Sequence, residues 1–360
     1  MNESARKYNF DHVMLYLHDQ MKLLPNLESK YIGLTMPFPR QAALRSRIIA
    51  SIETLKAYDE DVCIAVHFNQ SDAGAIEYEK IIFIGTDYLH LKRIADFMKR
   101  QDINLNIKDT CILYRECTAD LNINLKGNHS RITSLNDLFA GVEIHIDHLE
   151  AGMGYQYENK QVKEDIIHYC CHKDDEEGKE LGYQLFVKSL DYFSKKLLAE
   201  GFVLGYPAVD SKIKIMKASC SMCFYRDYYY INGAHVSLET AMLEADWQIC
   251  EPLMQVHMTC NKLYFKGNSF FSGVENLCIL DEDEDNCKLS FKSRLSTIID
   301  ILEEMYNHKK DVSDFHIELD SYVPVEGVTQ LKEKFKVIYN IGKWKDELEE
   351  QEMNSTIPPV

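Results

Sequence analysis

The sequence predicts an α+β protein with two small split βαβ units on either side of a different, mixed α/β unit. The main observation is that strand-like and helix-like hydrophobic patterns occur in the order β-α-β-β-α-β near both ends of the chain. The length of 360 residues is enough for two or three small domains. A content of 46% hydrophobic and 27% charged residues is typical of a globular protein.

The first split βαβ unit is predicted over residues 29–110, after a leader at 1–28 that reads as a helix up to a break at Pro25 and Asn26. Strands are expected at 31–35, 62–68, 79–84 and 103–107. Between them, helix 41–58 places Leu44, Ile48, Ile52 and Leu55 on one face. A second helix, 87–100, begins at Asp87, a suitable N-cap, and places Leu91, Ile94, Phe97 and Met98 on one face. This order is the ferredoxin-like one.

The middle unit is predicted over residues 111–249 and has a different pattern. Hydrophobic residues alternate along 141–149 and 209–215, as in half-buried strands. A periodic helix at 181–200 stops at Gly201, which suits the C′ position of a helix. A further helix is expected at 237–248, with Ser237 as its cap.

The last unit, 250–335, repeats the first pattern. Strands are expected at 252–258, 274–280, 288–291 and 315–319, and a helix at 294–306. The acidic run at 281–285 is expected to be a solvated turn. Residues 336–360 are expected to form a final helix and a disordered tail.

Charge and cysteine content restrict the function classes. The net charge of -17 argues against a non-specific nucleic-acid coat, because phosphate binding needs a basic surface, although local basic patches remain compatible with it. There are 11 cysteines, no apolar signal segment at the N-terminus, and no apolar stretch of the roughly 20 residues that span a bilayer. These features predict a cytoplasmic protein with reduced thiols and with no membrane or DNA partner.

Several short stretches carry a family likeness. Gly85 at a strand end is followed by Leu89-His90-Leu91, and Tyr114-Arg115-Glu116 stands at the next unit boundary. The middle unit contributes 154–160 and 200–210, which includes Gly205-Tyr206-Pro207-Ala208-Val209-Asp210. The last unit begins with Glu251-Pro252-Leu253-Met254 and ends with 320–325. In this order and spacing, from about 31 to 327, the chain resembles the C-terminal half of elongation factor G, the ribosomal translocase family.

The resemblance implies a fold for each unit. Residues 29–110 would correspond to domain III and 250–335 to domain V, both ferredoxin-like. Residues 111–249 would correspond to domain IV, which is similar to domain 2 of ribosomal protein S5, with enlarged tip loops.

The nucleotide-binding motifs of that family are missing from this sequence. A phosphate loop needs Gly-Lys followed by Ser or Thr, but Gly178-Lys179 and Gly342-Lys343 are followed by Glu180 and Trp344. Asn159-Lys160 and Asn261-Lys262 lack the aspartate of the guanine-reading motif. The sequence therefore predicts a protein that is not an enzyme, with no catalytic residue and no cofactor.

Candidate ribosome-binding residues lie in two tip loops and one basic helix. The resemblance places the loops after Lys160 and between Ile215 and Val236, and both depart from the family through an acidic run at 173–178 and an aromatic run at 224–230. The candidates are Lys160, Lys163, His172, Tyr225, Arg226, Tyr228, Tyr229, His235, Lys92 and Arg93. The alternatives are a hairpin that packs its tyrosines on its own sheet, which we favour, and a solvated helix face around Lys92 and Arg93.

A zinc site is a weaker possibility on the same two loops. If they touch, soft ligands would converge, namely Cys170, Cys171, His172, Cys220 and Cys223. A single Cys-x-x-Cys pair is a weak signal, and ordinary thiols are the favoured interpretation. We therefore assign no metal.

Three functions follow as hypotheses. The first is a ribosome-binding factor without its own GTPase, which occupies the translocation-factor site to modulate, protect or silence ribosomes through contacts with rRNA and ribosomal proteins. The second is one half of a split translocase with a separate GTPase chain, which exposed apolar residues in the leader would favour. The third is a domain series reused as a protein-interaction module.

Overall fold

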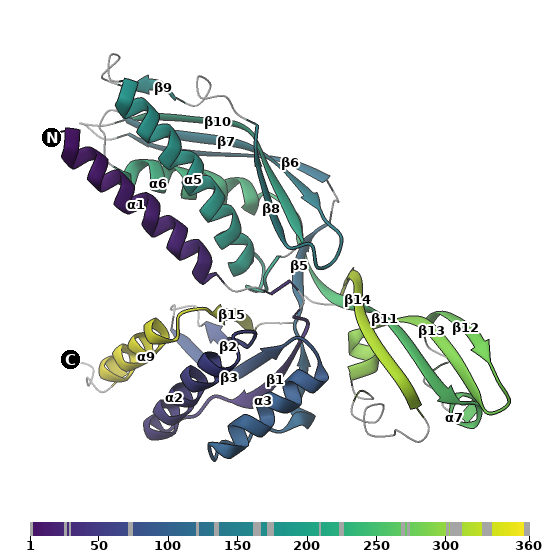
Figure 1. Ribbon diagram of the computed structural model, residues 1–360. Coiled ribbons are helices and arrows are strands. Elements are labelled where there is room, and N and C mark those ends of the chain that lie inside the picture. Colours follow the sequence, from purple (N-terminus) through teal and green to yellow (C-terminus); the bar gives the residue numbers. More distant parts are fainter. Residues whose placement is uncertain are drawn as a thin grey trace. The chain divides into compact units, whose positions relative to one another are not determined.

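The computed structural model describes most of the chain, and the structural statements below concern the described residues. These are 3–24, 27–28, 30–70, 75–119, 122–132, 137–160, 167–170, 176–208, 210–222, 227–267, 271, 274–299, 302, 312–325 and 333–355. They form two compact units. One contains Met1–Pro25 and Glu116–Gln248, and the other contains Asn26–Arg115 and Ile249–Val360. The protein is mixed α+β with antiparallel sheets, as the sequence predicts (Figure 1).

The unit formed by 26–115 and 249–360 contains two sheets, of which sheet A comes first. Sheet A has the strand order β15-β2-β3-β1-β4, and all neighbouring strands are antiparallel. Its elements are β1 (Ile32–Pro37), α2 (Ala42–Tyr58), β2 (Cys63–Gln70), β3 (Ile76–Gly85), α3 (Tyr88–Arg100), η1 (Ile107–Asp109), β4 (Thr110–Ile112) and β15 (Lys334–Ile338).

Helix α3 begins where the sequence predicts. The Asp87 carboxylate accepts the backbone N–H of His90 at 2.8 Å, so Asp87 is the N-cap. Leu91, Ile94 and Met98 are buried, as expected from the apolar stripe.

The strand predicted at 103–107 is wrong. Ile103 and Leu105 are buried in alternation, but the Ile103 N–H bonds to the Met98 carbonyl at the end of α3. The closing strand is β4, which pairs with 32–34 of β1.

The C-terminal segment returns to sheet A. Strand β15 pairs with β2 from Lys334 opposite Phe68 to Ile338 opposite Ile64. Helix α9 (Ile341–Ser355) follows and buries three apolar side chains, Ile341, Trp344 and Leu348. The predicted last unit ends at 335, whereas the pairing places 334–338 on sheet A.

Sheet B repeats the β2-β3-β1-β4 order of sheet A and has its own fifth strand, β5 (Arg115–Thr118), which pairs with β11. Its order is β12-β13-β11-β14. Its elements are β11 (Trp247–Asn261), α7 (Lys262–Gly267), β12 (Glu275–Glu282), β13 (Asn286–Arg294), a helical stretch at 295–299 and 302, and β14 (Val312–Pro324). Leu295, Ile298 and Leu302 are buried, as expected from their helical spacing in the sequence, and Ile299 is half-buried.

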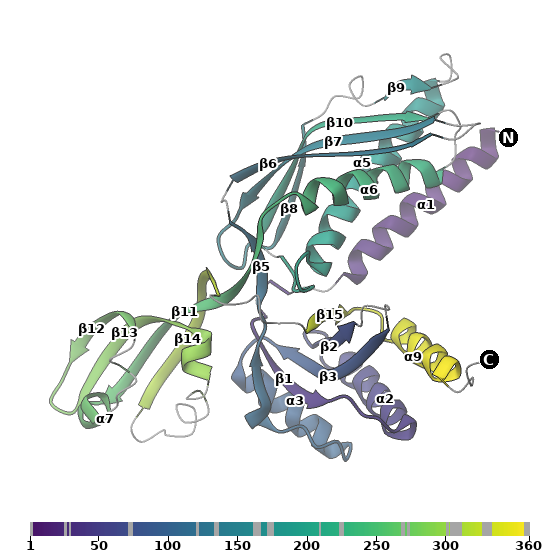
Figure 2. The ribbon, with the colours of Figure 1, turned by 180° about the vertical axis from the view of Figure 1, so that it is seen from behind.

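The other unit contains sheet C, with the order β6-β7-β10-β8 and with β9 also paired to β10. Strands β8 and β9 are parallel to β10, and the other pairs are antiparallel. Helices α5 and α6 cover one face of the sheet, and α1 lies against α5 (Figure 2). The elements are α1 (Glu3–Leu23), β5 (Arg115–Thr118), β6 (Asn122–Ile132), β7 (Asp137–His148), β8 (Tyr155–Asn159), β9 (Ile167–Cys170), α5 (Glu176–Glu200), β10 (Ser211–Met222) and α6 (Asp227–Leu243).

Of the two helix ends predicted in this unit, the end of α5 is confirmed and the start of α6 is wrong. Helix α5 ends at Glu200, and Gly201 has φ +70°, as predicted for a C′ glycine. The predicted cap at Ser237 is wrong, because Ser237 lies inside α6 and its hydroxyl donates to the Gly233 carbonyl at 2.6 Å. Helix α6 starts ten residues earlier, at Asp227. None of the described helices is long and apolar enough to cross a membrane.

Candidate functional site

A buried carboxylate holds the connection between α5 and β10. The Glu116 side chain accepts five backbone N–H groups, those of residues 202–206. The bonds from Val203 to Tyr206 measure 2.8, 2.8, 2.9 and 3.1 Å. Because both oxygens are fully engaged with backbone donors, Glu116 is a structural anchor for this loop and not a catalytic group. Glu116 is part of a motif noted in the sequence, but the sequence alone indicates no role for it.

The stretches that carry the resemblance in the middle unit meet each other in space. Asp210 has φ +56°, and its carboxylate accepts the Gly154 N–H at 2.7 Å. From there β8 runs parallel to β10, with Tyr155 opposite Ser211. At the far end the Lys160 N–H bonds to the Ile215 carbonyl at 3.2 Å. The two predicted tip loops therefore start from neighbouring strands.

The unit boundaries carry further buried charges. Arg115 is completely buried and donates to the carbonyls of Leu27, at 2.9 Å, and Lys30. Near the other boundary, the buried Glu251 carboxylate accepts Arg294 Nη1 at 2.8 Å. These contacts stabilise the fold locally, because an unpaired buried charge would cost several kcal/mol, on the order of 3–5.

Only part of the predicted tip-loop surface lies within the described residues. Lys163, His172, Tyr225 and Arg226 lie outside them. Lys160 is exposed, and its ammonium group is 3.5 Å from the Glu158 carboxylate. Its charge is therefore partly neutralised.

The tyrosines of the predicted aromatic run lie on a helix and differ in burial. Residues 228–230 lie in the first turn of α6, so the hairpin alternative is wrong. Tyr228 is exposed, Tyr229 is half-buried, and Tyr230 is buried against α5, where a Cβ on Gly182 would come within 2.5 Å of the Tyr230 ring. The rings of Tyr228 and Tyr229 meet edge to face, with centroids 5.9 Å apart, whereas Tyr230 is part of the core.

The His235 side chain packs against the fold and does not point freely into solvent. Its ring stacks on Phe193 at 4.4 Å with an interplanar angle of 17°. Burial holds the pKa of His235 below its ordinary value, so the ring is neutral at pH 7.

The cysteines of the zinc alternative are only partly described. Cys220 is buried in the core of sheet C, and the backbone of Cys170 is opposite Met222. Cys171, His172 and Cys223 lie outside the described residues. Among the described residues no group of three metal-ligating side chains occurs, and the zinc alternative stays untested.

The open face of sheet C is charged but internally paired. Two of the carboxylates each lie between two lysines, the third lies between a lysine and a histidine ring, and the lysine hydrogen bonds hold the pKa values of all three below their ordinary range. The groups are Lys126–Glu143–Lys217, Lys214–Asp147–His145 and Lys212–Glu158–Lys160. These surface ion pairs offset part of the charge of the five lysines.

Helix α3 presents cations that are not paired. Lys92, Arg93, Lys99 and Arg100 are exposed, and none of them forms an ion pair with another described residue. The opposite side of the helix is buried in sheet A, so the orientation of these side chains is fixed. Of the predicted candidates, Lys92 and Arg93 are therefore exposed cations with no ion pair among the described residues.

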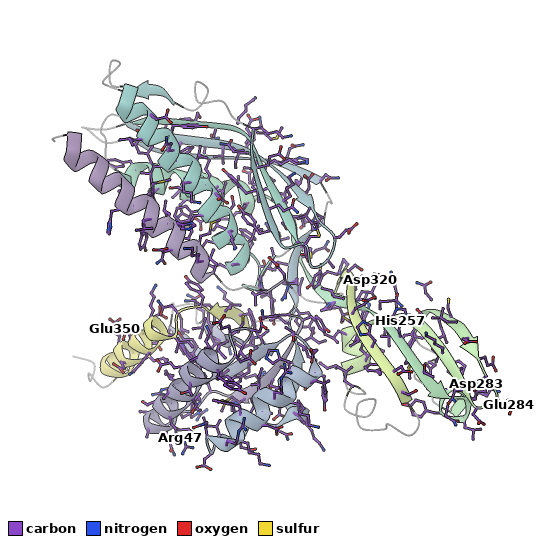
Figure 3. All side chains as sticks on the ribbon, in the orientation of Figure 1. Arg47, His257, Asp283, Glu284, Asp320 and Glu350 are labelled. Atoms are coloured by element: carbon purple, nitrogen blue, oxygen red, sulfur yellow. The ribbon has the colours of Figure 1, made fainter. Side chains whose placement is uncertain are left out.

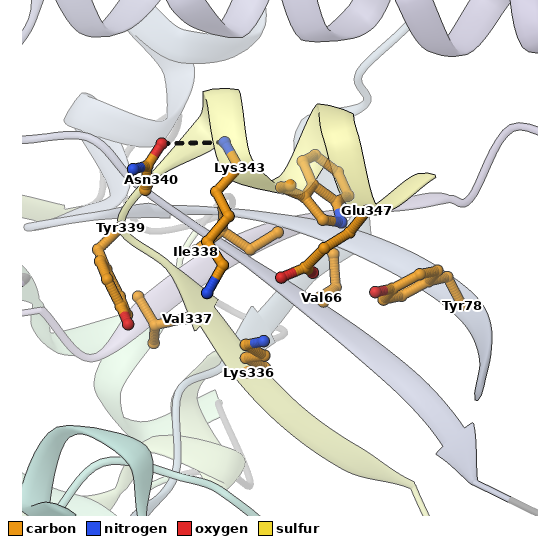
Figure 4. A pocket seen from close by; sticks show the side chains of 10 residues that line it. Val66, Tyr78, Lys336, Val337, Ile338, Tyr339, Asn340, Lys343 and Glu347 are labelled. Atoms are coloured by element: carbon orange, nitrogen blue, oxygen red, sulfur yellow. Dashed lines mark hydrogen bonds between the residues drawn. The ribbon is translucent and has the colours of Figure 1, made fainter. Parts of the chain in front are cut away.

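A small, open hollow of about 40 Å³ lies between β15, α9, β2 and β3 (Figure 4). Lys336, Lys343 and Glu347 are its charged residues, and Asn340 caps α9 by accepting the Lys343 N–H at 3.0 Å. Burial, and then the Glu347 carboxylate, raise the pKa of Tyr78 in its wall. The hollow was not expected from the sequence, because no strand was predicted at 334–338.

Comparison with known proteins adds little. No protein-family model matches the chain. The crystal structure of ttk003000868 from Thermus thermophilus is similar at a TM-score of 0.49 and 13% identity, over 83% of this chain and 41% of that one. The chain thus spans less than half the length of that protein. A likeness of this size assigns neither a family nor a function.

Proposed function

We propose that this protein binds ribosomes as a translation-factor-like protein and that these 360 residues do not hydrolyse GTP. The repeated strand order carries the proposal. Sheets A and B, taken without β15 and β5, both have the order 2-3-1-4 in their own strand numbering, which is the order expected for a split βαβ, ferredoxin-like unit. Between them in the chain lies sheet C, with a different order. Two ferredoxin-like domains around an S5-like domain are what the resemblance to elongation factor G implies.

The positions of the quoted motifs also support the proposal. Glu116 binds the 202–206 loop, and Asp210 binds Gly154, so stretches that are far apart in sequence contact each other. A chance collection of short motifs would not be expected to meet in this way. We expect the protein to occupy the translocation-factor site and to modulate, protect or silence the ribosome there.

Sedimentation tests the proposal. Purified protein should pellet with ribosomes from its own cell at low salt, equally with and without GTP, and should release no phosphate from GTP. The affinity should fall steeply with salt if basic residues contact rRNA. Failure to pellet at low salt, or GTP hydrolysis by the purified chain, would contradict it.

One observation favours the second hypothesis, a partner GTPase chain. Leu15 and Tyr16 on α1 are each 57% exposed, next to the buried Leu17. Adjacent exposed apolar side chains are typical of a docking surface. Under this hypothesis, Leu15→Ser with Tyr16→Ser should abolish capture of a chain that carries a phosphate loop. The captured pair should hydrolyse GTP, and a partner without that activity would reject the idea.

A further inference from the structure

An exposed aromatic pair lies where α2 ends beside α3. Tyr58 is the last residue of α2 and is 79% exposed, although tyrosine rings are usually at least half-buried. Its ring stacks on Phe97 of α3, with centroids 6.1 Å apart and an angle of 21°. The guanidinium carbon of Arg100 lies 5.9 Å from the Phe97 ring. We refer to Tyr58, Phe97 and Arg100 as the α2–α3 platform.

Hydrogen bonds of the residue after Tyr58 hold the platform in place. The Asp59 carboxylate lies 3.0 Å from Nε2 of the buried His90, and the Asp59 N–H bonds to the Leu55 carbonyl at 2.8 Å. His90 Nδ1 accepts the Thr86 N–H at 3.1 Å. Tyr58 is therefore held next to α3 by its neighbour in the chain, and a ligand would find the ring already in place.

Helix α3 places positive charge beside the platform, while the acidic residues Asp59, Glu60 and Asp61 follow Tyr58 in the chain. Arg93 precedes Phe97 by one helical turn, and Lys92 and Lys99 are also exposed and unpaired among the described residues. Helix α3 has four Lys and Arg side chains and one carboxylate, Asp96, in a chain of net charge -17. The local charge thus opposes that of the whole chain and favours an anionic partner.

We propose that the α2–α3 platform stacks an unpaired RNA base while Arg93 and Lys99 bind the flanking phosphates. This inference rests on the proposed function and specifies the partner of its basic helix. Aromatic faces and guanidinium planes stack on any base, and cations beside them follow the phosphate chain. In a continuous RNA duplex the base faces are covered, so the platform requires a loop, a bulge or a single strand.

Tyr58 was not among the residues that the sequence indicated, whereas Lys92 and Arg93 were. The contact between α2 and α3 joins residues 58 and 97, and nothing in either helix alone indicates it. The sequence signal that could have indicated Tyr58 is an aromatic residue at the end of a helix, next to charged residues.

The test uses the full chain and two probes, a fluorescein-labelled single-stranded RNA and a fully paired RNA duplex. Tyr58→Ala should weaken single-strand binding about 5- to 100-fold, the range found for losing one stacked base, while Tyr58→Phe stays within about twofold. Leu263→Ala and Lys288→Gln are matched controls, since both side chains are exposed on sheet B and its helix α7, and they should bind like the parent. Circular dichroism melting verifies that each variant is folded.

A crosslinker at position 58 identifies the partner. With a benzophenone amino acid replacing Tyr58, irradiation of the ribosome complex should join the protein to rRNA, at a nucleotide without a Watson–Crick partner. Crosslinks to ribosomal protein alone, or equal binding by Tyr58→Ala and the parent, would overturn the inference.

The two proposals fail separately. If the parent protein pellets with ribosomes and Tyr58→Ala leaves RNA binding unchanged, only the platform proposal is rejected. If the parent protein binds single-stranded RNA through Tyr58 but does not pellet with ribosomes, the platform proposal stands and the proposed function is rejected.

Discussion

Sheets A and B share a strand order but differ at the corresponding edge. In sheet A, the edge at β2 is covered by β15 and followed by α9. In sheet B the corresponding strand, β12, is the last of its sheet, and Ile279 and Leu280 are 52% and 55% exposed. The charge differs too: α3 beside sheet A is basic, whereas Asp283 and Glu284 stand at the β12–β13 turn of sheet B (Figure 3).

The difference teaches that a repeated topology does not repeat a function. Strand order is set by the pattern of buried hydrophobic residues, which both sheets share. Binding surfaces are set by exposed side chains, which can change with little effect on the core. Each prediction below alters one side of this comparison.

The largest effect is expected from uncovering sheet A. Trp344 is 4% exposed and packs against the rings of Phe38 and Tyr78. Trp344→Ala should lower the free energy of unfolding by about 3–5 kcal/mol in urea, because it removes a buried indole and leaves a cavity. The exposed neighbour Lys345 is the control, and Lys345→Ala should change stability by less than about 0.5 kcal/mol. An unchanged urea midpoint for Trp344→Ala would show that α9 does not stabilise sheet A.

A smaller loss of folding stability is expected from removing the buried His90 of α3, which packs beside sheet A. His90→Ala removes the contact with Asp59 and the acceptor for the Thr86 N–H, and should cost about 2–3 kcal/mol. The matched change in sheet B, His316→Ala, removes a ring that is 66% exposed and should cost less than about 0.5 kcal/mol. Thermal unfolding of both variants measures the difference, and equal losses would contradict it.

Charge reversal on α3 should affect binding and not folding. Arg93→Glu with Lys99→Glu should weaken co-sedimentation with ribosomes about tenfold and lower the salt dependence by about one unit for each phosphate that is no longer bound. Lys288→Glu on sheet B should leave both quantities unchanged. If both reversals weaken binding equally, the effect reflects net charge and not a site on α3.

Acid should destabilise sheet A before sheet B. Burial lowers the pKa of His67, on β2, below 6.5, and its ring lies 3.0 Å from the Glu333 carboxylate. The unfolded chain then binds more protons, so stability present above pH 6.5 is lost as the pH falls below it. In sheet B, the Lys292 hydrogen bond lowers the pKa of Asp320 below 3.8, so that contribution is lost only in stronger acid.

Hydrogen exchange between about pH 7 and pH 5.5 tests this order. The β2 amides should lose protection on acidification while those of β11 keep it. His67→Gln should remove the pH dependence at β2. A simultaneous loss in both sheets would point to a titrating group other than His67.

The smallest effect on stability is expected at the bare edge of sheet B. Leu280→Lys should change the free energy of unfolding by less than about 0.5 kcal/mol, because the side chain is already exposed. It should reduce self-association at high concentration, since a charge on an edge strand opposes pairing with another strand. Sedimentation velocity measures this, and a loss above about 1 kcal/mol would show that Leu280 packs in the fold.

Local signals in the sequence predicted local structure well. Asp87 caps α3, Gly201 ends α5, and the buried stripe Leu91, Ile94 and Met98 lies as expected, because each depends on residues within a few turns. The same reasoning failed at Ser237, which resembles a cap but sits inside α6. The tyrosines before it read as a hairpin because aromatic residues favour strands, whereas packing of Tyr230 against α5 decides for a helix.

The candidate site was harder to predict than the fold. Lys92 and Arg93 could be proposed because a basic helix is visible in the sequence, and their role in binding stays a prediction. His235 was a poor candidate, since its stacking on Phe193 joins residues over forty positions apart. Glu116 was noted without a role, because only the folded chain brings 202–206 to its carboxylate.

The sequence by itself determined the α+β class, the basic side of α3 and the apolar faces of the helices, because these follow from hydrophobic period and charge along short segments. Only the tertiary structure decided that β15 covers sheet A, that β4 closes it at 110–112, and that Tyr58 lies on Phe97. Each of these depends on contacts between segments distant in the chain, whose free energy no local pattern contains.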